Sequence, residues 1–581
     1  MTSAASTANA AVPAPGKLEF KDDYTPEEAE RVIRNSKGLP VGVKPKMVWT
    51  WPKALLWAAI AIVCAIGWAI LAVSRGEQIS AIWFVVVALC SYAIAYRFYA
   101  YYIQIKIMRT DDANATPAER VHDGANFERA DRRVLFGQHF AGISGAGPLV
   151  GPILAAQMGY LPSVMWIILG VIFAGAVQDM LMLWISAKRR GRSFGQMATD
   201  EMGKFGGTIL SIFLIVMTAI AMAFLALVAI KAMASSPWAV FSIGMTIPIA
   251  LIMGCFQRFL HRSVIETTVL GFVLLVIDII AGGWISSVPA IADVFTLSAK
   301  ELVIALVIYS FAAAALPHWL LVTPRDYLST LMKIGTLVLL VLGILIANPS
   351  VQMPALTEFA STSTGPTFAG DLFPFLFITI ACGAVSGFHA LISSGTTPKL
   401  LANETDARFI GYGAMLMESF VAIMALVAAS IIEPGLYFAM NTPPAGLGIT
   451  MPNLHEMGGE NAPIIMAQLK DVTAHAAATV SSWGFVISPE QILQTAKDIG
   501  EPSVLNRAGG APTLAVGIAH VFHKVLPMAD MGFWYHFGIL FEALFILTTV
   551  DNGTRVARYQ IGEMLGNVRK LKKFADPTWK P

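Results

Sequence analysis

Residues 138–152, QHFAGISGAGPLVGP, lie inside an apolar segment that is long enough to cross a membrane. The glycines and prolines of this stretch exclude one unbroken helix, because proline lacks a backbone donor and clashes with the preceding turn. In hydrocarbon, irregular backbone persists only where it lines a cavity or is buried in protein, since unpaired backbone groups are costly there. The stretch therefore predicts a discontinuous membrane helix, an element in which secondary transporters bind substrates and ions.

The composition of the chain is typical of a polytopic membrane protein. Of its 581 residues, 56% are hydrophobic and only 13% are charged, whereas soluble domains carry roughly 25% charged residues. Apolar runs of about 20 residues, sufficient to cross a bilayer, recur along the chain. All four cysteines fall within predicted spans, so no disulfide framework is expected. The net charge of +2 gives no indication of nucleic-acid binding, and no nucleic-acid partner is expected.

The sequence divides into three predicted parts. Residues 1–50 are polar and are expected to form a cytoplasmic extension, because the apolar segment that follows begins too late for a signal peptide. Residues 51–550 are expected to form the transmembrane transporter domain. Within it, 433–510 are predicted to form a long external loop, and 511–525 are too short to cross and are predicted to be re-entrant. Residues 551–581 are expected to form a basic cytoplasmic tail.

The charge distribution predicts about twelve spans with both termini in the cytoplasm, since the segments placed inside hold most of the lysines and arginines. The eighth span is placed at 302–322, where Pro317 interrupts it, and the tenth at 372–394. The third to seventh and the eighth to twelfth spans form two sets of opposite orientation, each beginning with a broken helix. This arrangement indicates an inverted repeat with the binding site between the halves. An ordinary proline kink is the alternative for the second break.

The two predicted breaks contain the candidate substrate-binding residues. Freed amides at the N-terminus of a half-helix attract a carboxylate, and freed carbonyls attract a cation. Close helix packing is the alternative, because small residues at these spacings also suit tight helix crossings. The predicted substrate-binding residues are Gly142, Ser144, Gly145, Gly147, Gly151, Pro317 and His318.

Ionisable and hydroxyl side chains within the spans are candidates for ion coupling. A carboxylate in the membrane is functional by default, although a structural pair or cap is the alternative. A histidine titrates near physiological pH. Clustered hydroxyls suit a Na⁺ site or a polar permeation wall, unless they bond to carbonyls of their own helix. The predicted ion-coupling residues are His139, Asp179, His389, Ser393, Ser394 and Glu418, with H⁺ as the coupling ion and Na⁺ as the alternative. The adjacent Arg325 and Asp326 are expected to form a local ion pair at the gate or the surface.

Long contiguous motifs carry a resemblance to one known family. They include GAGPLVGPILAAQMGYLP (145–162), GAVQD (175–179), PRDYL (324–328), LFPFLFITIACGAVSGFHALISSGTTPK (372–399) and FWYHFGILFEALFILT (533–548). Over about residues 50 to 570 the chain resembles the carbon starvation protein A (CstA) family, which includes peptide uptake proteins and a pyruvate–proton symporter. The resemblance implies an all-helical inner-membrane carrier of the amino acid–polyamine–organocation type, with a LeuT-like inverted-repeat core.

The chain departs from the family pattern at three places. Gln138 stands where the family usually has a second histidine, and 551–555 read DNGTR where DAGTR is usual. Family members generally continue with several more helices beyond the position of Pro581. The sequence is accordingly either a short member or a truncated product.

The residues predict a symporter that imports a small carboxylate nutrient, with H⁺ as the coupling ion. The resemblance implies that this nutrient is pyruvate or short peptides and that it is taken up under carbon starvation. Its partners are the substrate and the lipid bilayer of the inner membrane. A transporter-like nutrient sensor or channel is the alternative, and concentrative uptake separates the two. No catalytic residues, metal or cofactor are expected, because the chain has no Walker loop, HExxH or CxxC motif.

Overall fold

The computed structural model describes two short strands near the N-terminus and most of the chain from residue 50 onward. The described residues are 32–34, 40–43 and 50–574, apart from 74–78, 122–126, 234–235, 261, 316–321, 453–461, 506, 508, 567–570 and 572. Strands β1 (Val32–Arg34) and β2 (Pro40–Val43) pair in antiparallel orientation. All other elements of the described part are helical. The predicted helical fold class is therefore confirmed, with this small hairpin added.

Nine helices of the described part are long and apolar enough to cross a membrane. Some of them are built from two or more consecutive helical elements, joined by short π-helical turns at Ala95–Tyr99, Ile103–Met108, Val171–Gly175 and Arg408–Tyr412. The chain is thus a polytopic membrane protein. The helices that form these spans are α2 (Trp51–Val73), α3 (Ile82–Ile94), α4 (Ala100–Tyr102), α8 (Tyr160–Gly170), α9 (Ala176–Lys188), α10 (Phe194–Met233), α11 (Pro237–Phe259), α12 (Val264–Ser287), α15 (Val322–Ala347), α20 (Gly413–Ser430) and α26 (Met531–Gly566).

A tenth span is counted if the bent pair α6 (Arg132–Ile143) and α7 (Gly147–Ala155) crosses as one unit. Two of the twelve predicted spans are outside this set. The span expected at 302–322 corresponds to α14 (Ala299–Ala315), whose continuation is not described. The span expected at 372–394 is divided into α17 (Phe377–Thr379), α18 (Ala381–Ala384) and α19 (Gly387–Gly395).

Shorter elements connect the spans. Side-chain caps account for several helix starts: Asp131 accepts a hydrogen bond from the Arg133 amide at 2.7 Å before α6, and Ser263 and Glu266 form a capping box at α12. The remaining elements are α5 (Pro117–Arg120), α13 (Pro289–Phe295), α16 (Phe359–Thr362), α21 (Pro434–Asn441), α22 (Pro444–Leu447), α23 (Ala462–Ser482), α24 (Pro489–Asp498), α25 (Ala511–Val525), the π-helical turn Leu372–Leu376 and the 3₁₀ turns Ala156–Met158 and Thr397–Lys399.

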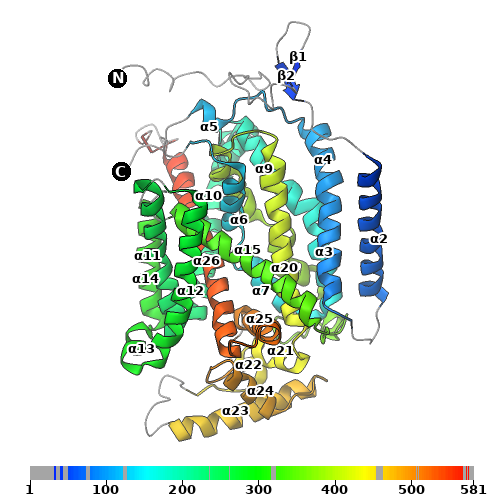
Figure 1. Ribbon diagram of the computed structural model, residues 1–581, viewed down its shortest axis with the longest axis vertical. Coiled ribbons are helices and arrows are strands. Elements are labelled where there is room, and N and C mark those ends of the chain that lie inside the picture. Colours follow the sequence, from blue (N-terminus) through cyan, green and yellow to red (C-terminus); the bar gives the residue numbers. More distant parts are fainter. Residues whose placement is uncertain are drawn as a thin grey trace.

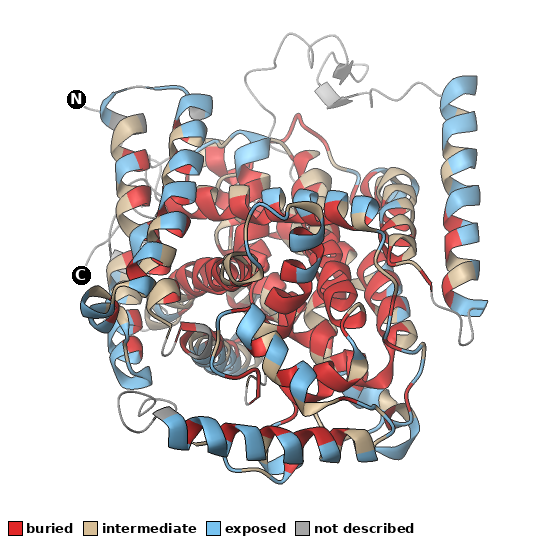
Figure 2. Ribbon diagram, turned by 60° about the horizontal axis from the view of Figure 1, so that its bottom comes forward, coloured by how far each residue is buried: buried red, intermediate tan, exposed pale blue. Residues whose placement is uncertain are grey.

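The protein core is centred on α20. In the span that contains α20, 89% of the residues in its most apolar 18-residue stretch are buried. In the corresponding stretch of α2, only 17% are buried. Figure 1 shows α2 at one edge of the molecule, beside α3, and Figure 2 shows its largely exposed surface. The exposed side chains of α2 include Leu55, Leu56 and Ile62, as expected for a helix that faces lipid.

The helices α21 to α24 lie together at one end of the molecule, and α26 runs from that end to the opposite one (Figure 1). α25 packs against α15, α20 and α26, and most of its side chains are buried. The predicted external loop at 433–510 therefore contains helices of its own. Its external position, and the re-entrant character of 511–525, stay predictions.

Candidate functional site

The predicted break in the third span is present between α6 and α7. α6 ends at Ile143, Ser144 has extended backbone (φ −80°, ψ 91°), and α7 begins at Gly147. The two halves are bent by 50°. Within the described part of the chain, no backbone carbonyl accepts a hydrogen bond from the amides of Gly145, Ala146 or Gly147. These amides form the positive N-terminal end of α7, as an anion-binding break requires.

A second break lies in the tenth predicted span. α18 and α19 are separated by Val385 (φ −157°, ψ 118°) and Ser386 (φ −123°, ψ 125°), both in extended conformation. The sequence indicated that this segment is rich in glycine and hydroxyl groups, but it did not predict a break here. The break that was predicted at Pro317 and His318 falls outside the described residues, so their role in substrate binding stays a prediction.

The two breaks are in direct contact, because α7 packs against α17 and α18. A Cβ atom added to Gly147 would lie 2.5 Å from both Cβ and Sγ of Cys382. One added to Gly151 would collide with the carbonyl oxygen of Thr379. Both glycines are therefore needed for this close approach, which is the packing role considered as the alternative to substrate binding.

The other predicted substrate-binding residues of the first break lie at the same junction. A Cβ atom on Gly142 would contact Ile392 of α19 at 3.3 Å, and one on Gly145 would contact Thr549 of α26 at 3.1 Å. Ser144 is fully buried, and its hydroxyl has no hydrogen-bond partner among the described residues. Gly142 and Gly145 are thus packed closely against α19 and α26, and the substrate-binding role of these residues stays a prediction.

Three of the predicted ion-coupling residues meet in one cluster. His389 of α19 hydrogen-bonds through Nδ1 to Oδ2 of Asp179 on α9 at 3.1 Å, and its Nε2 lies 3.0 Å from Oε2 of Glu418 on α20. All three side chains are fully buried. We call these three residues the His389 cluster.

The protonation state of His389 decides which contacts the cluster can make. An imidazole ring carries protons on both nitrogens only in its cationic form. That form donates from Nδ1 to Asp179 and places its positive charge 3.0 Å from Oε2 of Glu418, whereas the neutral ring leaves one carboxylate facing a nitrogen without a proton. The cluster therefore has two states that differ by one proton and by their contacts, as a proton-carrying site requires.

The His389 cluster is connected to the second break through its neighbours. Gln178, adjacent to Asp179 on α9, donates from Nε2 to the carbonyl of Ser386 at 2.5 Å. Cys382 donates from Sγ to Oε1 of Glu418 at 3.5 Å. The Cys382 thiol, the His389 imidazole and the Glu418 carboxylate each have a ligand atom within 4.8 Å of the others, so a transition metal ion could also bind there. Nothing in the sequence indicated a role for Cys382 beyond its place in the glycine-rich segment.

The remaining ion-coupling candidates are outside the cluster. Nδ1 of His139 is 2.8 Å from the hydroxyl of Thr397. Ser394 donates to the carbonyl of Ala390 at 2.6 Å, the bond within its own helix that was considered as the alternative, and the buried Ser393 hydroxyl has no partner among the described residues. A role for these three in ion coupling stays a prediction.

Comparison with known proteins identifies the family. The model of the family described as "Carbon starvation protein CstA" matches residues 80–581. The chain belongs to this family. It is 64% identical over 525 residues to the "Pyruvate/proton symporter BtsT" of Escherichia coli (strain K12), an alignment covering 90% of this chain and 73% of that protein. It is 53% identical over 526 residues to the "Peptide transporter CstA" of the same organism, covering 90% and 72% of the two chains.

A third relative, the "Peptide transporter CstA" of Mycobacterium tuberculosis (strain ATCC 25618 / H37Rv), is 48% identical over 548 residues, which cover 93% of this chain and 69% of the relative. No solved structure matches. The family membership predicted from the sequence motifs is thus confirmed.

In this CstA-family protein, one buried lysine at the first break was not predicted to have a role. Lys333 of α15 donates from Nζ to the carbonyls of Ala141 and Ser144 and to the hydroxyl of Thr548, at 3.3, 3.1 and 3.0 Å. Its position within an apolar helix was the available signal, because a cation in a span requires a partner.

The expectation of a local Arg325–Asp326 ion pair at the gate or surface is wrong. Both side chains are buried. Arg325 pairs instead with Asp551 of α26, at 3.0 Å, and Asp326 accepts a hydrogen bond from Nδ2 of Asn552 at 3.2 Å. Adjacent residues on a helix do not face each other, so Arg325 and Asp326 each contact a residue of a neighbouring helix instead. Asn552 is the residue at which DNGTR departs from the usual DAGTR.

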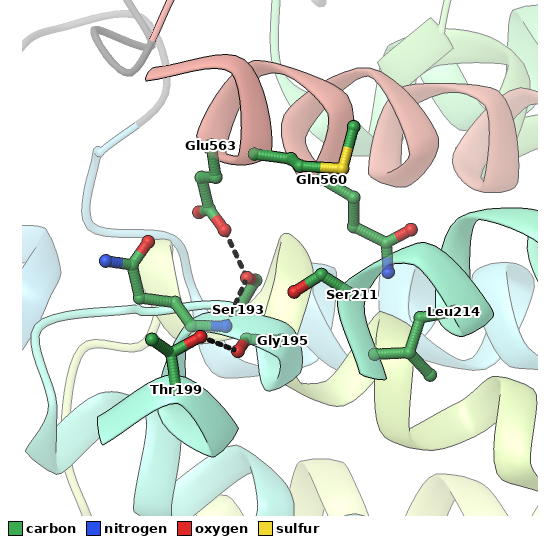
Figure 3. A pocket seen from close by; sticks show the side chains of 9 residues that line it. Ser193, Gly195, Thr199, Ser211, Leu214, Gln560 and Glu563 are labelled. Atoms are coloured by element: carbon green, nitrogen blue, oxygen red, sulfur yellow. Dashed lines mark hydrogen bonds between the residues drawn. The ribbon is translucent and has the colours of Figure 1, made fainter. Parts of the chain in front are cut away.

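A small pocket lies between the start of α10 and the end of α26, away from both breaks (Figure 3). Its polar lining includes Thr199, Ser211 and Gln560, and the Ser193 hydroxyl donates a hydrogen bond to Glu563 at its edge. None of the predicted site residues lines this pocket.

Proposed function

We propose that this protein is a proton-coupled symporter that imports a small carboxylate nutrient, pyruvate or a short peptide, under carbon starvation. The names of its relatives, a pyruvate/proton symporter and peptide transporters, support transport and favour H⁺ over Na⁺ as the coupling ion. The observation that carries the proposal is the placement of His389 between Asp179 and Glu418, buried beside two broken helices.

In the proposed mechanism the two breaks hold the substrate carboxylate. The amides of Gly145 and Gly147 at the start of α7 supply N–H donors, and the N-terminal end of α19 adds a second positive helix end. The helices are close-packed at Gly147, so the substrate enters as α7 and α18 separate. The binding site in this proposal is therefore assembled and released by movement at the breaks.

The proton in the proposed mechanism resides in the His389 cluster. Protonation allows His389 to contact Asp179 and Glu418 at once, which joins α9, α19 and α20. Loss of the proton weakens one of these contacts. Gln178 carries the change to the break, because it lies next to Asp179 and holds the Ser386 carbonyl. Proton movement and substrate movement are thereby linked through the same helix ends.

We further propose about twelve spans arranged as a LeuT-like inverted repeat in the bacterial inner membrane, with both termini cytoplasmic. The two broken helices in contact support the repeat, because paired discontinuous helices are typical of such folds. In this layout 51–550 form the transporter domain, 1–50 and 551–581 are the cytoplasmic ends, and 433–510 lie outside.

Uptake into proteoliposomes tests the proposal. Labelled pyruvate and a labelled dipeptide are compared with an inward proton gradient imposed or collapsed by an ionophore. We expect one of the two substrates to accumulate above equilibrium, and only with the gradient. His389→Gln should abolish accumulation, and His523→Gln, at an exposed position of α25, should retain it.

Three results would contradict the proposal. Equal internal and external concentrations of both substrates would indicate a channel or a sensor. Accumulation that follows a Na⁺ gradient instead would refute proton coupling. Accumulation by His389→Gln at the wild-type rate would refute the role of the cluster.

A further inference from the structure

Lys333 is held at the first break by hydrogen bonds to three oxygen atoms. Its side chain is fully buried. Nζ has three oxygen partners between 3.0 and 3.3 Å, two backbone carbonyls and the Thr548 hydroxyl. An ammonium group has three protons to donate, so these partners satisfy it.

The two carbonyls belong to the C-terminal end of α6. Ala141 lies in the last turn of this helix, which ends at Ile143, and Ser144 is the C-cap residue that follows. No backbone amide of the described residues donates to either carbonyl, because the chain turns away at the break. The C-terminal end of a helix carries a partial negative charge, which attracts a cation. Nζ also lies 4.2 Å from the centre of the Phe545 ring, a further favourable position for a cation.

Lys333 does not form a direct ion pair within the described residues. Asp326, two turns earlier on α15, and Glu418 of the His389 cluster are the acidic groups that attract it electrostatically. Asp326 is instead hydrogen-bonded by Asn552. Nζ of Lys333 is thus held by two carbonyls at a helix end and a hydroxyl, and not by a carboxylate.

Carbonyls of an unwound membrane helix together with a hydroxyl are also the ligands that bind Na⁺ in secondary transporters. We propose that the Lys333 ammonium is a tethered cation that occupies this site, so that the break of α6 and α7 is held without Na⁺. Lys333 is then a positioning residue. Its ammonium fixes the position of the end of α6, and thereby the position of the break amides that come next in the chain. Because the ammonium takes the place of Na⁺, transport is independent of Na⁺. The inference goes beyond the proposed function, because it concerns a monovalent-cation site that the protein fills with its own side chain.

Removal of the ammonium tests the inference. Lys333→Ala leaves the oxygen ligands and opens space beside them, whereas Lys333→Met fills most of that space without a charge. Uptake driven by a proton gradient is measured in choline medium and in Na⁺ medium, and the melting temperature of the purified protein is measured in both. The wild type should behave alike in the two media.

In choline, Lys333→Ala should lose at least about tenfold in uptake, the loss expected when charged hydrogen bonds are removed. Na⁺ should raise its melting temperature by about 2–4 °C, because a cation that binds only the folded protein stabilises it. Na⁺ should also restore part of its uptake. Lys333→Met should lose uptake and gain nothing from Na⁺, since its side chain blocks the vacated position.

Two outcomes would overturn the inference. The first is wild-type uptake by Lys333→Ala and Lys333→Met in choline. The second is a folded Lys333→Ala protein with neither a Na⁺-dependent melting shift nor rescue. If Lys333→Ala does not fold, Lys333→Gln serves instead, and uptake at the wild-type rate in that neutral variant would refute the need for a cation. The melting shift requires no substrate, so it is informative even if neither pyruvate nor peptide is transported and the proposed function fails.

Discussion

The close contact between the two breaks allows the energetic cost of Gly147→Ala to be predicted. The added Cβ would lie 2.5 Å from Cβ and Sγ of Cys382. Rotation of the Cys382 side chain moves Sγ but not Cβ, so the backbone of α7 or α18 must shift. Overpacking of this kind costs about 1–3 kcal/mol. This cost falls on the state in which the two breaks are in contact. The equilibrium between that state and the state in which α7 and α18 are separated therefore shifts by about 5- to 150-fold, away from the contact state.

The assay is the initial rate of proton-driven uptake, normalised to the amount of protein in the membrane. Gly147→Ala should reduce the rate, and a second substitution, Cys382→Gly, should restore much of it by removing both clashing atoms. Gly244→Ala on α11 is the matched control, because a Cβ at that position meets nothing within 4 Å. Wild-type uptake by Gly147→Ala would refute the reasoning. So would a double variant no better than the single one, since the clash with Cys382 would then not be the cause.

Two further predictions concern the buried polar contacts of α26. Asn552→Ala leaves the buried Asp326 without its amide donor and should lower the free energy of unfolding by about 1–3 kcal/mol; an unchanged melting temperature would show that this hydrogen bond contributes little. Arg325→Met removes the ion-pair partner of the buried Asp551 and leaves it only the hydrogen bond from the Tyr309 hydroxyl, which should cost about 3–5 kcal/mol. The double variant Arg325→Met/Asp551→Leu should recover much of that loss in thermal melting, and a double variant as unstable as the single one would contradict the pairing.

The first break could be predicted because its cause is local. Pro148 and the surrounding glycines prevent a continuous helix whatever the rest of the chain does. The second break has no proline between Ala381 and Gly387, and it follows α18, which packs against α7 at Gly147. The composition of that segment therefore indicated weak helicity without locating the interruption.

The site residues could be predicted one by one, but their assembly could not. Asp179, His389 and Glu418 were each identified as ionisable groups inside a span. Their meeting depends on how three helices pack, which no spacing in the sequence encodes. Lys333 was missed for the same reason, since its partners include backbone carbonyls, and a carbonyl is present at every position of the sequence.

The central claim is that the His389 cluster carries the coupled proton, and substrate-driven proton movement tests it most directly. Proteoliposomes with a pH-sensitive dye inside receive an inward gradient of the transported substrate and no imposed pH gradient. The wild type should acidify the interior as substrate enters, at a rate above that of protein-free liposomes, and His389→Gln should not. Substrate entry without acidification in the wild type, or acidification at the wild-type rate in His389→Gln, would contradict the account.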